Sequence, residues 1–317
     1  MTTPRVLIIE TFADAYAQQL SVHFPGIKTS TAASVSAIDV ALDEIDILIA
    51  FGIAIDNPTL ATASRLQWIQ SLATGVDHFL RCKALKPNTI LTSARGIHGP
   101  PMRETVAYLM LSVARRGRLL HEHQTAHRWD RGAPWSLLHG KTAVIVGVGI
   151  SGIAIAQLLK SFGMTVVGAS RTPRGIEGFD RIVPTGDLAA AVSSADYVIN
   201  VLPGAAENSN LIDACVFAAM QPAAIFINVG RGETVDEGAL IAALQNRMIA
   251  GAGLDVFGSE PLARDNPLWA MPNVIVTPHI AGYVAEYEQL VMPIVTHNMR
   301  AFLADRRDEM RNIVLHP

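Results

Sequence analysis

The chain has 317 residues, enough for two domains with separate hydrophobic cores. Half of its residues are hydrophobic and 17% are charged, a composition that excludes a largely disordered chain. The 25 lysine and arginine residues nearly balance 28 aspartate and glutamate residues, and the net charge of -3 gives no electrostatic reason to expect nucleic-acid binding. A small-molecule ligand is the more natural expectation.

The apolar stretches are too short to span a membrane. One of the longest, residues 106–114, falls well short of the 18 or more residues that a bilayer requires. The N-terminus shows no export signal, and Cys82 and Cys215 lie far apart, outside any CxxC spacing. We therefore expect a cytoplasmic protein with no membrane segment, disulfide framework or metal site.

Short β-rich runs alternate with segments of helical period. A first series of strands is predicted over residues 6–9, 47–51, 68–72 and 89–93, with a helix over 16–23. A second series is predicted over residues 142–146, 165–169, 197–201, 224–229, 251–255 and 274–277, with helical segments between most of its strands. This alternation predicts two parallel sheets built from βαβ units.

Two further helical segments lie outside this rhythm. Residues 103–118 predict one long helix opened by Pro100 and Pro101, followed by a stretch rich in Trp, Gly and Pro over 127–135. We interpret this region as a hinge followed by an arm. Residues 286–304 predict a last helix with no strand after it.

A glycine-rich turn follows the strand over 142–146. Gly147, Gly149 and Gly152 form a GxGxxG pattern that opens a helix over 153–162, which Gly163 ends. An ordinary turn is the alternative, but a strand before the glycines and a helix after them favour a dinucleotide. The amide groups of Ile150 and Ser151, at the start of the helix, would then face the pyrophosphate.

The end of the next strand favours NADP over NAD. NAD-dependent proteins usually carry an acidic residue there, about 20 residues beyond the glycines. This chain instead has Ser170, Arg171 and Arg174, and no carboxylate until Glu177. A hydroxyl and two guanidinium groups suit a 2′-phosphate, although two solvated surface arginines are the alternative.

Three charged or titratable residues follow the ends of successive strands. They are Arg231, Glu260 and His279. Each alone has an ordinary alternative, as a turn arginine, a solvated loop acid and a capping or core histidine. Because ligands bind beyond the carboxyl ends of strands in open α/β sheets, all three could instead face one crevice.

Taken together, these blocks resemble the D-isomer-specific 2-hydroxyacid dehydrogenase family, and its glyoxylate/hydroxypyruvate reductases in particular. The resemblance extends over nearly the whole chain. It includes residues 71–77, similar to the family's substrate-carboxylate loop, residues 96–100 before the long helix, the glycine turn, and the Arg, Glu and His blocks in order.

The resemblance implies an α/β fold of two doubly wound parallel-sheet domains. A flavodoxin-like substrate domain would comprise residues 1–99 and 286–317, and a Rossmann dinucleotide-binding domain would comprise residues 100–285. The family also implies a homodimer formed through residues 103–135.

The implied reaction is hydride transfer from NADPH to a small 2-oxo acid. His279 would act as the acid/base, Glu260 would stabilise its protonated form, and Arg231 would clamp the carboxylate and carbonyl oxygens. The substrate carboxylate would bind to the backbone of four loop residues, Ala73, Thr74, Gly75 and Val76. Further cofactor contacts are implied for Leu202, Pro203, Val229, Gly230, Asp255 and Gly282, with Asp255 orienting the nicotinamide amide.

One departure from the family pattern and one alternative function remain. Residues 202–208 lack the threonines common in this loop, which puts side-chain contacts to the cofactor there in doubt. The alternative is a non-catalytic, dinucleotide-sensing protein that recruits partners, as the family's corepressors do.

Overall fold

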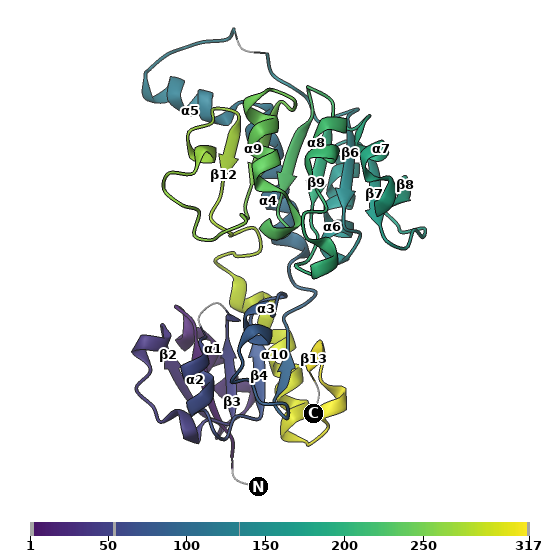
Figure 1. Ribbon diagram of the computed structural model, residues 1–317. Helices are drawn as coiled ribbons and strands as arrows, with labels where there is room; N and C mark the ends of the chain where they lie inside the picture. The colour runs from purple at the N-terminus through teal and green to yellow at the C-terminus, as the bar shows by residue number, and fades with distance from the viewer. Residues whose placement is uncertain (1–2, 53–54, 133, 316–317) are drawn as a thin grey trace. The chain divides into compact units, whose positions relative to one another are not determined.

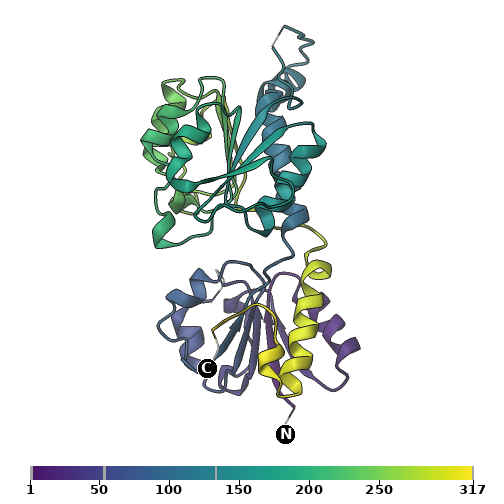
Figure 2. The ribbon, with the colours of Figure 1, turned by 90° about the vertical axis from the view of Figure 1, so that its right-hand side faces the viewer.

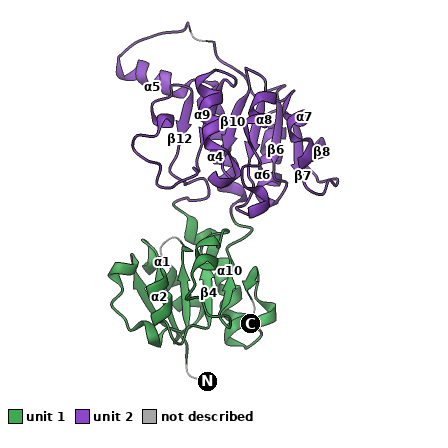
Figure 3. Ribbon diagram, viewed as in Figure 1, with its two compact units in different colours: residues 1–97, 285–317 green, residues 98–284 purple. Residues whose placement is uncertain are grey.

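The computed structural model describes residues 3–52, 55–132 and 134–315. The chain forms two compact units, which Figure 3 colours separately. Unit 1 comprises Met1–Ile97 and Ala285–Pro317, and unit 2 comprises His98–Val284. Each unit has a twisted sheet with helices on both faces (Figure 2), which confirms the predicted fold class of two α/β parallel-sheet domains.

The sheet of unit 1 has the strand order β13-β5-β4-β3-β1-β2 (Figure 1). Its strands are β1 (Arg5–Ile9), β2 (Lys28–Ala32), β3 (Ile47–Ala50), β4 (Trp68–Ser71), β5 (Ile90–Thr92) and β13 (Ile313–Leu315). Every residue of β3 and β4 is buried, as expected for inner strands covered on both faces. The helices are α1 (Ala13–His23), α2 (Asn57–Thr62), α3 (Asp77–Arg81) and α10 (Tyr287–Leu303).

The prediction that no strand follows the last helix is wrong. Strand β13 pairs antiparallel with β5, whereas all other neighbours in this sheet are parallel. Helix α10 covers the sheet and brings the C-terminal segment to its edge. The rings of Trp68 and Phe302 stack with centroids 5.4 Å apart, and Asn298 Nδ2 donates to Gln70 Oε1 at 2.9 Å.

The sheet of unit 2 is parallel throughout, with the strand order β12-β11-β10-β9-β6-β7-β8. Its strands are β6 (Thr142–Val146), β7 (Thr165–Ser170), β8 (Arg181–Pro184), β9 (Tyr197–Asn200), β10 (Ile225–Asn228), β11 (Gly251–Leu254) and β12 (Val274–Val276). The chain runs outward from β6 in one direction and from β9 in the other. The carboxyl ends of β6 and β9 therefore flank the switch point where such sheets bind ligands.

Helices cover both faces of this sheet. One core includes side chains of α4 (Gly99–Ala114) and α6 (Ile150–Ser161), and the other includes side chains of α7 (Leu188–Val192), α8 (Ala214–Ala219) and α9 (Glu237–Gln245). Helix α4 packs closely against β11, because a Cβ added at Gly253 of this strand would lie 2.8 Å from the Cβ of Leu109 in α4.

The single long helix predicted over 103–118 is two helices. Helix α4 includes Pro100 and Pro101 in its first turn, where the missing N–H groups cost no hydrogen bond. The chain then turns at Arg116, whose φ is 48°, and α5 (Gly117–Thr125) follows. Within the described parts of the chain, no helix is long and apolar enough to cross a membrane.

Candidate active site

All candidate residues of unit 2 lie at one edge of its sheet. Each follows or ends a strand: Gly147 after β6, Ser170 in β7, Leu202 after β9, Arg231 after β10, Asp255 and Glu260 after β11, and His279 after β12. The carboxyl ends of parallel strands share an edge, so the fold brings these loops together.

The glycine turn has the backbone that a pyrophosphate requires. Gly147 has a φ of +110°, and a Cβ added at Gly152 would lie 2.1 Å from the Gly147 carbonyl oxygen, which only glycine avoids. A Cβ at Gly149 would meet nothing within 4 Å, so the turn is open on that side. No side chain caps the start of α6, and its amide groups fit a dinucleotide pyrophosphate.

The arginine at the end of β7 has an acidic partner from another loop. Arg171 Nη1 lies 2.9 Å from Glu207 Oε1, and Glu207 belongs to the single-turn helix η5 (Ala206–Asn208) after β9. Hydrogen bonds from its own backbone amide and from Arg171 lower the pKa of Glu207 below the ordinary value. Ser170 Oγ donates to the Thr172 carbonyl at 3.4 Å, and Arg174 is exposed.

Two buried asparagines hold the loops after β9 and β10. Asn200 Nδ2 donates to Asn228 Oδ1 at 2.9 Å and to Thr234 Oγ1 at 2.7 Å. Their side-chain oxygens accept from the amides of Leu202 and Gly230, both at 3.2 Å. This network fixes the backbone around Leu202, Pro203, Val229 and Gly230. Sequence reasoning missed it, although an asparagine at the end of two successive apolar strands was a visible signal.

The loops after β10 and β11 are in close contact. Arg231 Nη1 donates to the Gly230 carbonyl at 2.8 Å, and Thr234 Oγ1 donates to the Arg231 carbonyl at 2.6 Å. A Cβ added at Gly232 would lie 1.8 Å from the Phe257 carbonyl oxygen. Arg231 is thereby held beside the loop that carries Glu260.

Glu260 and His279 form a direct pair. Glu260 Oε2 lies 2.6 Å from His279 Nδ1, and Oε1 accepts from the Phe257 amide at 3.0 Å. Burial raises the pKa of Glu260, but the hydrogen bonds from His279 and Phe257 and the nearby charge of Arg231 outweigh it, so the pKa lies below the ordinary 4.5. A carboxylate is therefore fixed against one nitrogen of a half-exposed imidazole.

Asp255 fixes the loop that carries His279. Its carboxylate is buried and accepts from Thr277 Oγ1 at 2.5 Å, from the Ile280 amide at 3.0 Å and from the Ala281 amide at 2.8 Å. Its backbone carbonyl accepts from the His279 amide at 2.8 Å. The left-handed backbone of His279, with φ of 55°, is held by these bonds.

A second histidine, which sequence reasoning missed, lies near this loop. A Cβ added at Gly282 would be 2.8 Å from His98 Cδ2, so the His98 ring packs on the Gly282 backbone. Burial, with the positive charge of Arg231, lowers the pKa of His98 from 6.5 to about 4. His98 is therefore neutral near pH 7.

The predicted substrate loop lies in unit 1, after β4. The Ser71 hydroxyl oxygen accepts from the Ala73 amide at 3.1 Å, and the Ala73 carbonyl accepts from the Ala94 amide at 2.9 Å. Val76 is buried, whereas Thr74 is exposed and Gly75 is half-buried. The middle of this loop is thus accessible and its base is fixed.

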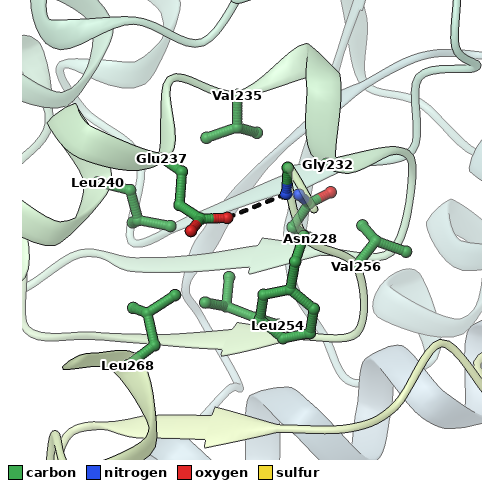
Figure 4. A pocket seen from close by; sticks show the side chains of 10 residues that line it. Asn228, Gly232, Val235, Glu237, Leu240, Leu254, Val256 and Leu268 are labelled. Atoms are coloured by element: carbon green, nitrogen blue, oxygen red, sulfur yellow. Dashed lines mark hydrogen bonds between the residues drawn. The ribbon is translucent and has the colours of Figure 1, made fainter. Parts of the chain in front are cut away.

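Other features of unit 2 do not extend the site. A small pocket (Figure 4) is lined mainly by apolar side chains, with Glu237 accepting from the Gly258 amide at 2.9 Å. Arg231, Glu260 and His279 are not among its lining residues. In the ranges 3–52, 55–132 and 134–315, no group of three or more His, Cys, Asp or Glu side chains could hold a metal ion.

Known proteins resemble this chain over nearly its full length. The sequence profile described as "D-isomer specific 2-hydroxyacid dehydrogenase, NAD binding domain" matches residues 107–281. Glyoxylate/hydroxypyruvate reductase B of Klebsiella pneumoniae is 36% identical over 297 residues, 89% of this chain and 90% of that protein.

Solved structures of the same family also superpose on this chain. A D-isomer specific 2-hydroxyacid dehydrogenase family protein from Aeromonas salmonicida superposes with a TM-score of 0.90 at 34% identity and covers 99% of both chains. An NADPH-dependent glyoxylate/hydroxypyruvate reductase from Sinorhizobium meliloti, in complex with NADP and sulfate, gives a TM-score of 0.82 at 27% identity over 98% of both chains. These matches confirm the resemblance drawn from the sequence motifs.

Proposed function

The chain belongs to the D-isomer specific 2-hydroxyacid dehydrogenase family, and from that premise we propose that it is an NADPH-dependent reductase of glyoxylate and hydroxypyruvate. Membership makes it an NAD(P)-dependent oxidoreductase of small 2-oxo and 2-hydroxy acids. The observation that carries the proposal is the contact of 2.6 Å between Glu260 and His279, with Arg231 on the adjoining loop.

His279 is the proton donor in this proposal. Bound NADPH would supply a hydride for the carbonyl carbon, and the negative charge that develops on the carbonyl oxygen would require a proton donor. Because Nδ1 of His279 faces Glu260, Nε2 is the nitrogen that gives the proton. Glu260, whose lowered pKa keeps it ionised, stabilises the imidazolium before transfer and holds the ring afterwards.

Arg231 is the anion-binding side chain of unit 2 in this proposal. Arg231 uses one N–H on the Gly230 carbonyl, and a guanidinium has five N–H groups in all, so donors remain for the carboxylate and carbonyl oxygens. In unit 1, the backbone amides of Thr74, Gly75 and Val76 are the groups proposed for a carboxylate, whereas the Ala73 amide already donates to Ser71 Oγ. The buried Asp255 acts as a positioning residue for His279, because three donors already occupy its carboxylate.

The cofactor is NADPH in this proposal. The open backbone at Gly149 and the uncapped start of α6 support a pyrophosphate site, and Ser170, Arg171 and Arg174 support a 2′-phosphate site. The NADP complex of the Sinorhizobium meliloti reductase adds support from a relative.

We also propose a homodimer through residues 103–135, of which residue 133 lies outside the described residues. Large apolar side chains are exposed there, among them Trp129 at 92%, Tyr108 at 56% and Leu120 at 42%. Replacing Leu120 and Trp129 together by Ser should shift the mass in light scattering from dimer to monomer. The same change at Leu80 of unit 1, which is 48% exposed, serves as the control.

The test of function is steady-state oxidation of NADPH and NADH with glyoxylate, hydroxypyruvate and pyruvate. We expect turnover of the first two acids, with about 10- to 1000-fold preference for NADPH in kcat/KM. His279→Ala should lower kcat by about 100- to 10,000-fold and leave the Kd of NADPH nearly unchanged. NADPH binding without turnover of any of the three acids would contradict the reductase and favour a dinucleotide sensor.

A further inference from the structure

An ion pair joins two loops of unit 2 that are far apart in the sequence. Arg171 Nη1 and Glu207 Oε1 are 2.9 Å apart, and their side chains are 69% and 53% exposed. Both lie in unit 2, and their loops follow β7 and β9. The pair does not contribute to the hydrophobic core of unit 2, because more than half of each side chain is exposed to solvent.

The pair crosses the end of the strand that leads into the glycine turn. Strand β6 lies between β7 and β9 in the sheet, and neighbouring strands are about 4.8 Å apart, so the two loops start about 10 Å apart. The glycine turn begins at Gly147, directly after β6. The Arg171–Glu207 contact therefore crosses the carboxyl end of β6, next to the proposed dinucleotide site.

The loop that carries Glu207 is anchored. Asn208 is buried, its Nδ2 donates to the Pro203 carbonyl at 3.0 Å, and its amide donates to the Ala205 carbonyl at 2.9 Å. On the other side, Arg171 follows Ser170, which pairs with Pro184 of β8. The backbone next to each residue is thus held, and the 2.9 Å contact joins the two exposed side chains across these loops. The hydrogen bonds to Glu207 also keep its carboxylate ionised near neutral pH.

We propose that Glu207 is a specificity-determining residue that competes with the 2′-phosphate of the cofactor for Arg171. This inference rests on the proposed use of NADPH. Binding of the phosphate requires Arg171 to exchange the carboxylate for the phosphate, and it leaves Glu207 beside a second anion. NADH carries no phosphate, and the pair stays intact when NADH binds. Glu207 thus lowers the preference for NADPH that Ser170, Arg171 and Arg174 create.

The test is the equilibrium Kd, by calorimetry, of NADPH, NADH, 2′,5′-ADP and ADP. Glu207→Gln should tighten NADPH and 2′,5′-ADP by about three- to ten-fold, since it removes one exposed ion pair and one repulsion. NADH and ADP should change by less than about two-fold, because neither ligand has a 2′-phosphate. Glu177→Gln removes one negative charge from the loop after β7 and is the matched control. It should change each Kd by less than about two-fold.

A double-mutant cycle separates competition from a general charge effect. In an Arg171→Ala background, Glu207→Gln should tighten the binding of NADPH by clearly less than it does in the wild type, because relief of the repulsion remains but Glu207 no longer competes for Arg171. An equal gain with and without Arg171 overturns the proposal.

The outcomes also separate this inference from the proposed function. If Arg171→Ala weakens the binding of NADPH but Glu207→Gln leaves every Kd unchanged, the competition is disproved and the proposed use of NADPH stands. If the wild type binds NADPH no more tightly than NADH and Arg171→Ala has no effect, the cofactor assignment itself fails. If Glu207→Gln weakens NADH, Glu207 binds the ribose hydroxyls of NADH, which also overturns the competition.

Discussion

At the residue scale, the proposed reaction depends on the charge of Glu260. Its pKa lies below 4.5, so its carboxylate supports His279 above that pH and loses this role as the pH falls through the lowered pKa. Glu260→Gln keeps the shape and removes the charge. We expect kcat for reduction near pH 7 to fall by about 10- to 100-fold.

Measurement of kcat from pH 3 to 9 checks this expectation. The acid limb that belongs to Glu260 should disappear in Glu260→Gln. Profiles of wild type and variant that coincide at every pH would show that the pair in the structure has no part in catalysis.

A second prediction at this scale concerns His98 and stability. The pKa of His98 is about 4 in the folded protein and 6.5 ordinarily, so between these values the unfolded chain binds a proton that the folded chain does not. The free energy of unfolding therefore falls as the pH drops from about 7 towards 4, and this effect is absent above pH 7. The ring is partly exposed, so the effect is smaller than full burial would give.

His98→Gln removes this titration. The decrease in Tm between pH 7.5 and 5.0 should shrink by about 2–4 °C relative to wild type, measured by scanning fluorimetry. The exposed His121, replaced in the same way, should leave the decrease as it is. A decrease in His98→Gln as large as in wild type would mean that other groups cause the acid sensitivity.

At the element scale, the turn between β6 and α6 depends on one missing Cβ. Gly152→Ala would place a Cβ 2.1 Å from the Gly147 carbonyl oxygen, so the turn and the first turn of α6 must separate. We expect the Kd of NADPH to rise by at least about ten-fold.

Gly175→Ala is the matched control, because a Cβ there meets nothing within 4 Å and no positive φ is required. Cofactor fluorescence gives the Kd, and a melting curve shows whether each variant is folded. Tight NADPH binding by a folded Gly152→Ala protein would show that the turn adapts and that glycine is dispensable there.

Sequence patterns located inner strands well and edge strands poorly. Strands β3, β4 and β9 are buried throughout, and each begins with consecutive large apolar or aromatic side chains that propensity detects. Strand β2 is rich in Thr and Ser and only partly buried, and β8 ends in Pro184. Edge strands need only one partner and can be polar, so no apolar run marks β2 or β8.

Site residues that directly follow a strand could be predicted from the sequence. Contacts between loops that are distant in the sequence could not. Gly147, Arg231 and His279 each follow an apolar strand, so their shared edge could be inferred from topology alone. The Arg171–Glu207 pair joins residues 36 apart, and His98 meets Gly282 only through folding. Such contacts depend on loop conformation, which composition and periodicity do not specify.

At the scale of the whole molecule, the fold of unit 1 is completed by the C-terminal segment, which contains α10 and β13. The buried Asn298 accepts from the Arg311 amide at 2.7 Å and donates to the Arg311 carbonyl at 3.2 Å. Deleting residues 305–317 removes these partners and β13. The loss of hydrogen bonds at Asn298 should cost about 1–3 kcal/mol of unfolding free energy, and the loss of β13 adds to it.

Calorimetry should therefore show a lower Tm for unit 1, whereas the Kd of NADPH stays within about two-fold because the glycine turn belongs to unit 2. Asn298→Ala, which keeps the whole chain, should lower the Tm in the same direction. Cofactor affinity lost to the same extent as thermal stability would show that the two units depend on each other for folding.

The discontinuity of unit 1 also determines the order in which a ribosome can complete the two units. Unit 2 is contiguous and has all its strands once Val284 is made, whereas unit 1 must wait for α10 and β13. At typical synthesis rates, the roughly 190 intervening residues take about 10 to 40 s. Throughout that interval the nascent N-terminal sheet lacks the helix that stacks on Trp68, and the edge of β5 has no partner. Unit 1 thus begins before unit 2 along the chain and is completed after it, and its apolar surface is open to chaperones until α10 and β13 have been made.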